Sequence, residues 1–282
     1  MPDIWRPTVN EYPHIGLTSN LLAWGRAATY VHSMTNLLAK SALFLAVSLG
    51  AMTSLAQAEQ RPPEQRPIVV ELFTSQGCPA CPPADAFLND LAKREDVLAL
   101  SLPVNIWDYL GWRDTLAKQA FTDRQRAYVQ NLGGRSVYTP QMVIDGVEDA
   151  VGSRTGHVNS AIELRRKMMT EDVAIDFVPD GDSIQLNVGA LATDKEATLW
   201  LVHYVKETPV VIERGENSGE TITYSNVVRD MVPVGMWKGD AISLTFPKSD
   251  LVGESYDGCA AILQVDGNGQ ILGAARLDMS AL

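Results

Sequence analysis

The feature that most constrains this chain is a pair of cysteines placed between an apolar segment and a helix. Residues 68–74 are almost continuously apolar, which predicts a strand that is buried on both faces, and Cys78 and Cys81 follow it. Pro82 and Pro83 favour a helix start, because the first helical turn needs no N–H from those positions. A helix N-terminus stabilises a thiolate, so the arrangement indicates thiol–disulfide exchange. We expect Cys78 to be the more exposed, attacking sulfur and Cys81 to be its resolving partner.

Two other interpretations of the cysteine pair stay open: a static structural disulfide, and capture of copper(I) or zinc by the two thiolates. A structural zinc site needs about four ligands. After residue 58 the chain has only His157 and His203, and neither is near the motif in sequence. We therefore predict no metal and no cofactor apart from the redox-active disulfide itself. The third cysteine, Cys259, lies in a strand-like run and is expected to be a buried free thiol.

Residues 1–58 are predicted to be a signal peptide or leader rather than part of the fold. Lys40 precedes the apolar run 41–50, and residues 56–58 (Ala-Gln-Ala) give a small-x-small cleavage pattern. Met34 is the expected true start, because the segment from there to residue 58 has a normal signal length. The protein would then be exported, periplasmic or secreted, with no stable membrane span after cleavage. An uncleaved membrane anchor is the alternative.

Charge limits the partners of the remaining chain. The full sequence has a net charge of −11, and its first 58 residues carry three basic and two acidic side chains, so the remainder is near −12. Such an acidic chain is not expected to bind nucleic acid or anionic lipid through its net charge. The partner predicted by the cysteine pair is a protein or small-molecule thiol or disulfide substrate.

Residues 59–67 form a predicted proline-containing linker, and a βαβ unit follows it. A helix is expected over 83–94 and a second apolar strand over 97–104, which pairs in parallel with the first strand. Thr139-Pro140 precedes a further apolar strand. A cis peptide bond before Pro140 would leave the Thr139 backbone free to pair with an extended substrate. A trans proline at the start of an edge strand is the alternative.

Three further side chains are candidates for supporting the cysteines, each with a plainer interpretation beside it. Trp107 lies in an aromatic-rich loop at a strand's carboxyl end, where it either lines a substrate groove or covers the sheet. Glu71 either accepts the proton of Cys81 or faces solvent at the strand end. Asp85 follows Cys81 by four residues, on the same helix face, and is otherwise an ordinary first-turn charge.

The sequence pattern changes near residue 171, where helical periodicity gives way to alternating apolar residues and hairpin turns. This predicts an all-β, antiparallel sandwich-like domain over 171–282. The further strands expected there cover 197–205, 210–214, 241–246, 259–265 and 271–277. A polar cluster at 213–217 (Glu-Arg-Gly-Glu-Asn) either contacts the cysteine-bearing face or forms a solvated hairpin loop.

The order of strand, Cys-x-x-Cys, helix, strand, crossover helix, Thr-Pro, hairpin and final helix resembles that of thioredoxin. More narrowly, residues 71–78 (Glu-Leu-Phe-Thr-Ser-Gln-Gly-Cys) with 81–85 (Cys-Pro-Pro-Ala-Asp) are similar to a bacterial family of secreted thioredoxin-like proteins of unknown function. The resemblance implies a thioredoxin-like α/β domain over 68–170, followed by the all-β domain. It also implies that Cys78 is the nucleophile, Cys81 the resolving thiol and Pro140 a cis-proline.

The chain departs from the Trp-Cys-Gly-Pro-Cys signature of thioredoxin, because Gln76-Gly77 precede the motif and Pro79-Ala80 lie within it. The intervening pair helps to set the reduction potential, so the direction of the redox chemistry stays open. The predicted function is an exported thiol–disulfide oxidoreductase acting on protein or small thiol substrates. The alternative is a non-catalytic thioredoxin-like binding module for a protein partner or for copper or zinc, with a structural disulfide.

Overall fold

The computed structural model describes residues 65–253 and 255–279. The predicted signal peptide and all but the last three residues of the predicted linker lie outside the described residues. The described residues belong to one compact unit. None of the described helices is long and apolar enough to cross a membrane.

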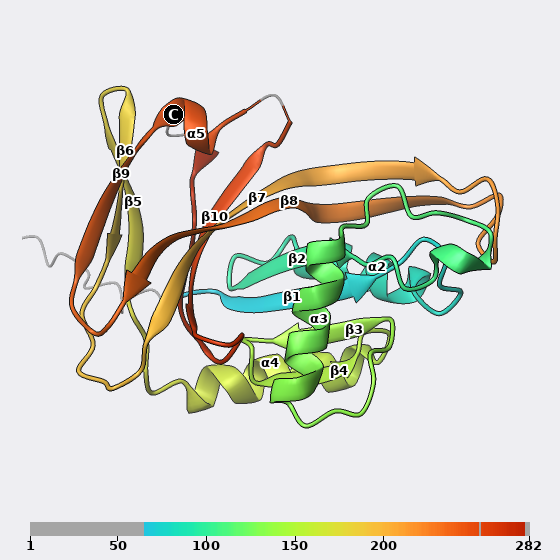
Figure 1. Cartoon of the computed structure of the whole chain (residues 1–282), viewed down its shortest axis with the longest axis horizontal. Coiled ribbons are helices and arrows are strands. Elements are labelled where there is room, and N and C mark those ends of the chain that lie inside the picture. The colour runs from blue at the N-terminus through green and yellow to red at the C-terminus, as the bar shows by residue number, and fades with distance from the viewer. Residues whose placement is uncertain (1–64, 254, 280–282) are drawn as a thin grey trace, which may run out of the picture. The chain divides into compact units, whose positions relative to one another are not determined.

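The described part of the chain is mostly β-structure (Figure 1). The strands are β1 (Ile68–Thr74), β2 (Val97–Pro103), β3 (Gln141–Ile144), β4 (Glu148–Val151), β5 (Ile175–Asp180), β6 (Ser183–Val188), β7 (Ala197–Val211), β8 (Thr221–Trp237), β9 (Ile242–Pro247), β10 (Gly258–Val265) and β11 (Ile271–Arg276). The helices are α2 (Pro82–Leu91), α3 (Gln119–Asn131), α4 (Thr155–Met168) and α5 (Lys248–Leu251), with a 3₁₀ turn η1 at Asp108–Leu110.

Eight of the strands form one mixed sheet in the order β11-β10-β7-β8-β2-β1-β3-β4. Strand β1 pairs in parallel with β2, as the βαβ pattern predicts, and antiparallel with β3. The long hairpin of β7 and β8, with 15 and 17 residues, joins this sheet beside β2 through the parallel pair Ser101 and Val227 (Figure 1). Strands β5, β6 and β9 form a separate three-stranded sheet.

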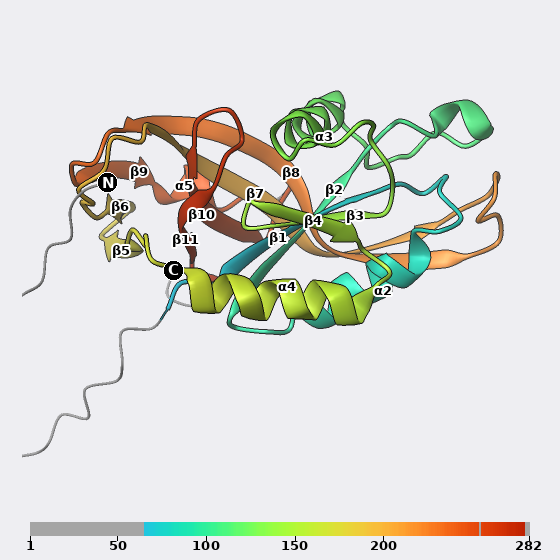
Figure 2. The ribbon, with the colours of Figure 1, turned by 90° about the horizontal axis from the view of Figure 1, so that it is seen from below.

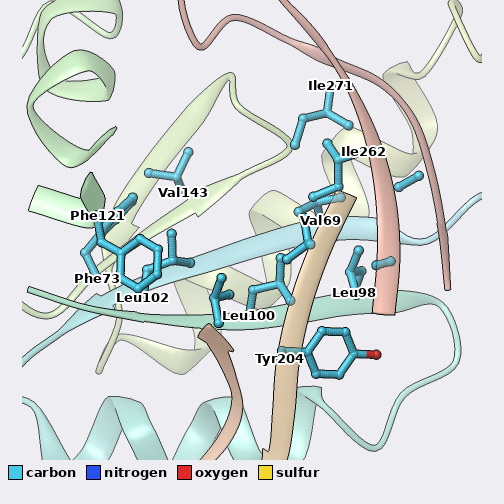
Figure 3. Packing of buried hydrophobic residues seen from close by; sticks show 14 of the residues in the cluster. Val69, Phe73, Leu98, Leu100, Leu102, Phe121, Val143, Tyr204, Ile262 and Ile271 are labelled. Carbon is cyan, nitrogen blue, oxygen red and sulfur yellow. The ribbon is translucent and has the colours of Figure 1, made fainter. Parts of the chain in front are cut away.

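The predicted fold class, a thioredoxin-like α/β domain followed by a separate all-β domain, is therefore wrong. Strands from both sides of the predicted boundary near residue 171 belong to the same sheet, with β8 directly beside β2. They also share one hydrophobic cluster, in which Val69 and Leu98 pack together with Tyr204, Ile262 and Ile271 (Figure 3). Apolar area buried in common stabilises the two segments together, so neither has a hydrophobic core of its own on this face of the sheet.

The central strands β1 and β2 are covered on both faces. Helix α3 lies on one face, and α2 and α4 lie on the other (Figure 2). Alternation along β1 directs Val69 and Phe73 toward α3, and Val70 and Leu72 toward α2 and α4. The position of a polar side chain along β1 therefore decides which helix it meets.

Candidate functional site

The two cysteines form a disulfide at the N-terminus of α2, immediately after the loop that leaves β1. Cys81 is the N-cap residue of α2, and the prolines that follow occupy its first two positions. The loop is closed by backbone hydrogen bonds: the Cys78 N–H donates to the Ser75 carbonyl at 3.1 Å, and the Cys81 N–H donates to the Cys78 carbonyl at 3.2 Å. The strand–turn–helix placement predicted from the sequence is confirmed.

Both cysteines are buried. Cys78 is 2 % exposed and Cys81 is fully buried, whereas Pro79 and Ala80 between them are exposed. Cys78 is the more exposed of the two only by this small margin. A sulfur must be reached by another sulfur for exchange to occur, so the accessibility of Cys78 depends on whatever covers it.

The disulfide loop is contacted by the loop that joins β7 to β8, residues 212–220, which we call the hairpin tip. The side-chain amide of Asn217 is buried and donates two hydrogen bonds, to the Gln76 carbonyl at 2.8 Å and to the Cys78 carbonyl at 3.0 Å. Gly215 in the same loop lies against Trp112, where an added Cβ would meet the Trp112 Cβ at 3.1 Å. Of the two interpretations left open for the polar cluster at 213–217, Asn217 fits the contact with the cysteine-bearing loop.

A second loop, which follows η1, contacts Gln76 of the disulfide loop. Gln76 is fully buried, and its backbone N–H donates to the Asp114 carboxylate at 2.8 Å. Its side-chain oxygen accepts hydrogen bonds from the Trp112 indole at 2.8 Å and from the Thr115 N–H at 3.2 Å. Burial raises the pKa of Asp114 to about 6, although three backbone N–H groups donate to it and oppose the rise. Sequence reasoning did not single out Gln76 or Asp114, because each reads alone as an ordinary loop residue.

Trp107 connects the disulfide loop to the Thr139-Pro140 segment. Its indole N–H donates to the Thr139 hydroxyl at 2.7 Å, and its Cβ lies 3.3 Å from the place where Gly77 would carry a Cβ. The Thr139–Pro140 peptide bond is cis, as the resemblance to thioredoxin implies. Trp107, a candidate supporting residue, thus contacts both Thr139 and Gly77 of the disulfide loop.

Asp85 lies one turn into α2 after Cys81 and is 2 % exposed. Burial raises the pKa of its carboxyl group to about 8; the Thr74 hydroxyl partly offsets the rise and the Asp114 charge adds to it. Neither Asp85 oxygen has a well-formed hydrogen bond, and the same is true of the buried hydroxyls of Thr74, Ser101 and Tyr224. Asp85 is therefore a protonated acid near neutral pH, buried close to the end of α2 that carries the disulfide.

Glu71 is not brought to the cysteines. It shares the α3 face of β1 with Val69 and Phe73, and its carboxylate oxygens bind the Arg124 guanidinium at 2.6 and 3.0 Å. The Tyr128 hydroxyl also donates to Glu71. Arg124 in turn donates to Gln264 of β10 at 2.8 Å, so the pair connects β1, α3 and β10 within the core. The described residues contain no cluster of His, Cys, Asp and Glu side chains able to hold a metal ion.

Residues 69–264 match the family described as Protein of unknown function (DUF1223). The chain belongs to this family. A crystal structure of an Agrobacterium tumefaciens protein, 32 % identical in sequence, superimposes with a TM-score of 0.67 over 76 % of this chain and 95 % of that one. The HBP35 protein of Porphyromonas gingivalis is 13 % identical, with a TM-score of 0.52 over 76 % of this chain and 75 % of its own, and shares the fold alone.

A short likeness to thioredoxin also exists. The DUF1223 chain is 50 % identical over 38 residues to a "Probable Thioredoxin" of Archaeoglobus fulgidus, which is 14 % of this chain and 42 % of that protein. The chain thus spans less than half the length of the curated relative that it matches. Membership of a family of unknown function agrees with the resemblance drawn from residues 71–85, but it provides no substrate. Secretion stays a prediction.

Proposed function

We propose that this protein is an exported thiol–disulfide oxidoreductase whose exchanging pair is Cys78 and Cys81. The observation that carries the proposal is the disulfide at the N-terminus of α2. The partial positive charge of a helix N-terminus stabilises a thiolate, and a thiolate is both the nucleophile and the better leaving group in disulfide exchange. The signal pattern in residues 1–58 supports an oxidising compartment for the reaction.

The exchange proceeds in two steps, written here in the oxidising direction. A substrate thiolate attacks the Cys78 sulfur, a new S–S bond forms, and the Cys78–Cys81 bond breaks with its electron pair leaving on Cys81. A second substrate thiolate then attacks the substrate sulfur of this mixed disulfide and releases Cys78 as a thiolate. The substrate loses two electrons and the cysteine pair gains them. The reverse sequence reduces a substrate disulfide.

Asp85 supplies the proton that this chemistry requires. Cys81 leaves as a thiolate in a fully buried position, where an uncompensated charge is costly. Asp85 holds a proton near neutral pH and lies one helical turn away on the same face of α2, so it can neutralise the Cys81 thiolate and later take the proton back. This role belongs to Asp85 and not to Glu71, whose carboxylate is committed to Arg124 on the opposite face of the sheet.

Access of a substrate to Cys78 in the proposed reaction involves displacement of the hairpin tip, which is bonded to the disulfide loop. The side-chain amide of Asn217 donates hydrogen bonds to the carbonyl groups of Gln76 and Cys78. Both acceptors belong to the disulfide loop, and a substrate chain lying across the disulfide would compete for them. We therefore include opening of the hairpin tip as a step that precedes exchange.

A second candidate function is favoured by the same burial. If the hairpin tip does not open, Cys78 and Cys81 form a structural disulfide, and the protein is a binding module for a partner. The two functions differ in the redox properties of the pair. Structural disulfides have reduction potentials below about −300 mV, whereas exchanging pairs lie above this value.

The test is a thiol titration of the purified protein across defined glutathione or dithiothreitol buffers. Cys259 is an internal reference, because it is fully buried and burial raises its pKa to about 12. We expect a potential above about −300 mV, and alkylation of reduced Cys78 at least about 100-fold faster than that of Cys259. A Cys259→Ser variant assigns the slow phase. A potential below about −300 mV, with Cys78 alkylating no faster than Cys259, would assign the protein to the structural class.

A further inference from the structure

A second site lies between α3 and the β7–β8 hairpin. It is a cavity of about 330 Å³ whose apolar wall is made by Phe121 of α3, Trp200 of β7 and Met231 of β8. None of its lining residues belongs to the disulfide loop or to the hairpin tip. Pockets that take small organic molecules start at about 300 Å³ and combine an apolar wall with a few placed polar groups.

The apolar wall is anchored in the core of the protein. Phe121 is buried within the cluster that covers β1 and β2, and Trp200 and Met231 pack against the edge of that cluster while staying partly exposed. A flat indole beside a phenyl ring and a polarisable thioether makes a rigid surface that suits a flat apolar group.

The charges at this cavity leave one cation uncompensated. The four other charged groups that line it are all ion-paired, in the pairs Lys118–Asp230, Asp123–Arg126 and Arg124–Glu71. Arg229 also lines the cavity, and its guanidinium has neither a hydrogen bond nor an ion pair within the described residues. In a chain with a net charge of −11, a lone guanidinium beside an apolar wall is an unusual local feature.

A break in strand pairing places Arg229. Val228 pairs with Tyr204 and Asp230 pairs with His203, so Arg229 is the extra residue of a β-bulge in β8. A bulge bends its strand and redirects the side chain of the extra residue, and bulges are frequent beside binding sites. Arg229 and the two residues that follow it, Asp230 and Met231, all line the cavity beside this bulge.

We propose that this cavity binds a small amphipathic organic anion. Its flat apolar body lies against Trp200, Phe121 and Met231, and its single carboxylate or sulfonate group pairs with Arg229. The inference is independent of the thiol–disulfide function, since no residue of the cavity takes part in the exchange.

The test uses two fluorescent dyes that share an apolar body. One is 8-anilinonaphthalene-1-sulfonate, and the other is N-phenyl-1-naphthylamine, which lacks the sulfonate. We expect both to bind the wild-type protein saturably, with one site. Arg229→Gln removes a charge-assisted contact, so it raises the dissociation constant of the sulfonate dye about tenfold. It changes the dissociation constant of the neutral dye by no more than about twofold. Trp200→Leu weakens both dyes.

The matched control is Arg135→Gln, which removes the same charge from an exposed arginine outside the cavity. It leaves both affinities unchanged. The proposal is overturned if neither dye binds the wild-type protein saturably, if Arg229→Gln weakens both dyes equally, or if Arg135→Gln matches the effect of Arg229→Gln. The redox titration of Cys78 is unaffected by Arg229→Gln, so failure of this inference and failure of the proposed function are separate outcomes.

Discussion

Asp85 makes the stability of this protein depend on pH in a direction opposite to that of an ordinary surface acid. Burial raises the pKa of Asp85 from 3.8 in a model peptide to about 8 in the folded protein. Between these values the native state keeps the proton that the unfolded chain releases, so the free energy of unfolding falls as the pH rises. Each pH unit in this window costs about 1.4 kcal/mol, so the loss from pH 4 to pH 7 is about 4 kcal/mol.

Replacing Asp85 with Asn removes this titration and keeps the shape of the side chain. The free energy of unfolding of Asp85→Asn relative to wild type is therefore expected to rise by about 4 kcal/mol between pH 4 and pH 7. The pKa of Asp114 is also raised, to about 6, so its contribution to the free energy of unfolding changes with pH in the same direction. Because Asp114 is present in both proteins, this contribution cancels in the comparison. Urea denaturation of the oxidised proteins at pH 4, 5.5 and 7 measures the difference.

Asp90→Asn is the matched control, because Asp90 lies on the same helix with a largely exposed side chain and a surface partner, Lys93. Its effect on the free energy of unfolding is expected to vary by less than about 0.5 kcal/mol over the same range. If Asp85→Asn and wild type lose stability in parallel from pH 4 to pH 7, Asp85 does not hold a proton in the folded protein. The proton-supplying role proposed for it would then fall as well.

Two further variants test the other contacts of the site and its support. Asn217→Ala removes two hydrogen bonds of about 1 kcal/mol each, so dithiothreitol should reduce the disulfide about 30-fold faster, while Ser218→Ala in the same loop leaves the rate unchanged. Equal rates for the two variants would show that the hairpin tip does not limit access. Glu71→Gln leaves the buried Arg124 without its counter-charge and is expected to destabilise the protein by about 3–5 kcal/mol in urea denaturation; a loss below about 1 kcal/mol would contradict this reading of the pair.

Local structure around the cysteines was predictable because it follows from nearby residues. The apolar run before Cys78 forms β1, and the prolines after Cys81 begin α2. Each of these features depends on the backbone preferences of a few adjacent residues. Such preferences act within a segment, so they identify elements without stating which elements become neighbours.

The arrangement of the sheet was not predictable, because it depends on β8. The sequence predicts strands at 197–205 and 210–214 and none over 221–237, yet β7 is continuous and β8 is the longest strand described. Two register shifts, a positive φ at Asn226 and a proline at 233 interrupt the alternation that would have revealed β8. Its contact with β2, which includes the Asn226 amide donating to the Ala99 carbonyl at 2.8 Å, joins residues more than 120 positions apart.

For the polar residues of the site, too, the sequence identified segments but not the contacts that individual side chains make. Asn217 was within the cluster that the sequence singled out, but its exposed neighbours Glu213 and Glu216 have the same polar character. Only the folded hairpin distinguishes the side chain that contacts the disulfide loop. Glu71 shows the converse: an acid in an apolar strand requires a partner, and that partner, Arg124, is 53 residues away on the face opposite to α2.

The most direct test of an exchanging Cys78–Cys81 pair is to capture its mixed disulfide. In a Cys259→Ser background, reduced Cys81→Ser is mixed with glutathione disulfide, and the adduct is measured by mass spectrometry before and after dithiothreitol. Because Cys78 then has no resolving partner, the account predicts a stable, reductant-sensitive glutathione adduct on Cys78, and none on Cys81 in the matched Cys78→Ser variant. Absence of the adduct from Cys81→Ser, or equal adducts in the two variants, would contradict the assignment of Cys78 as the exchanging sulfur.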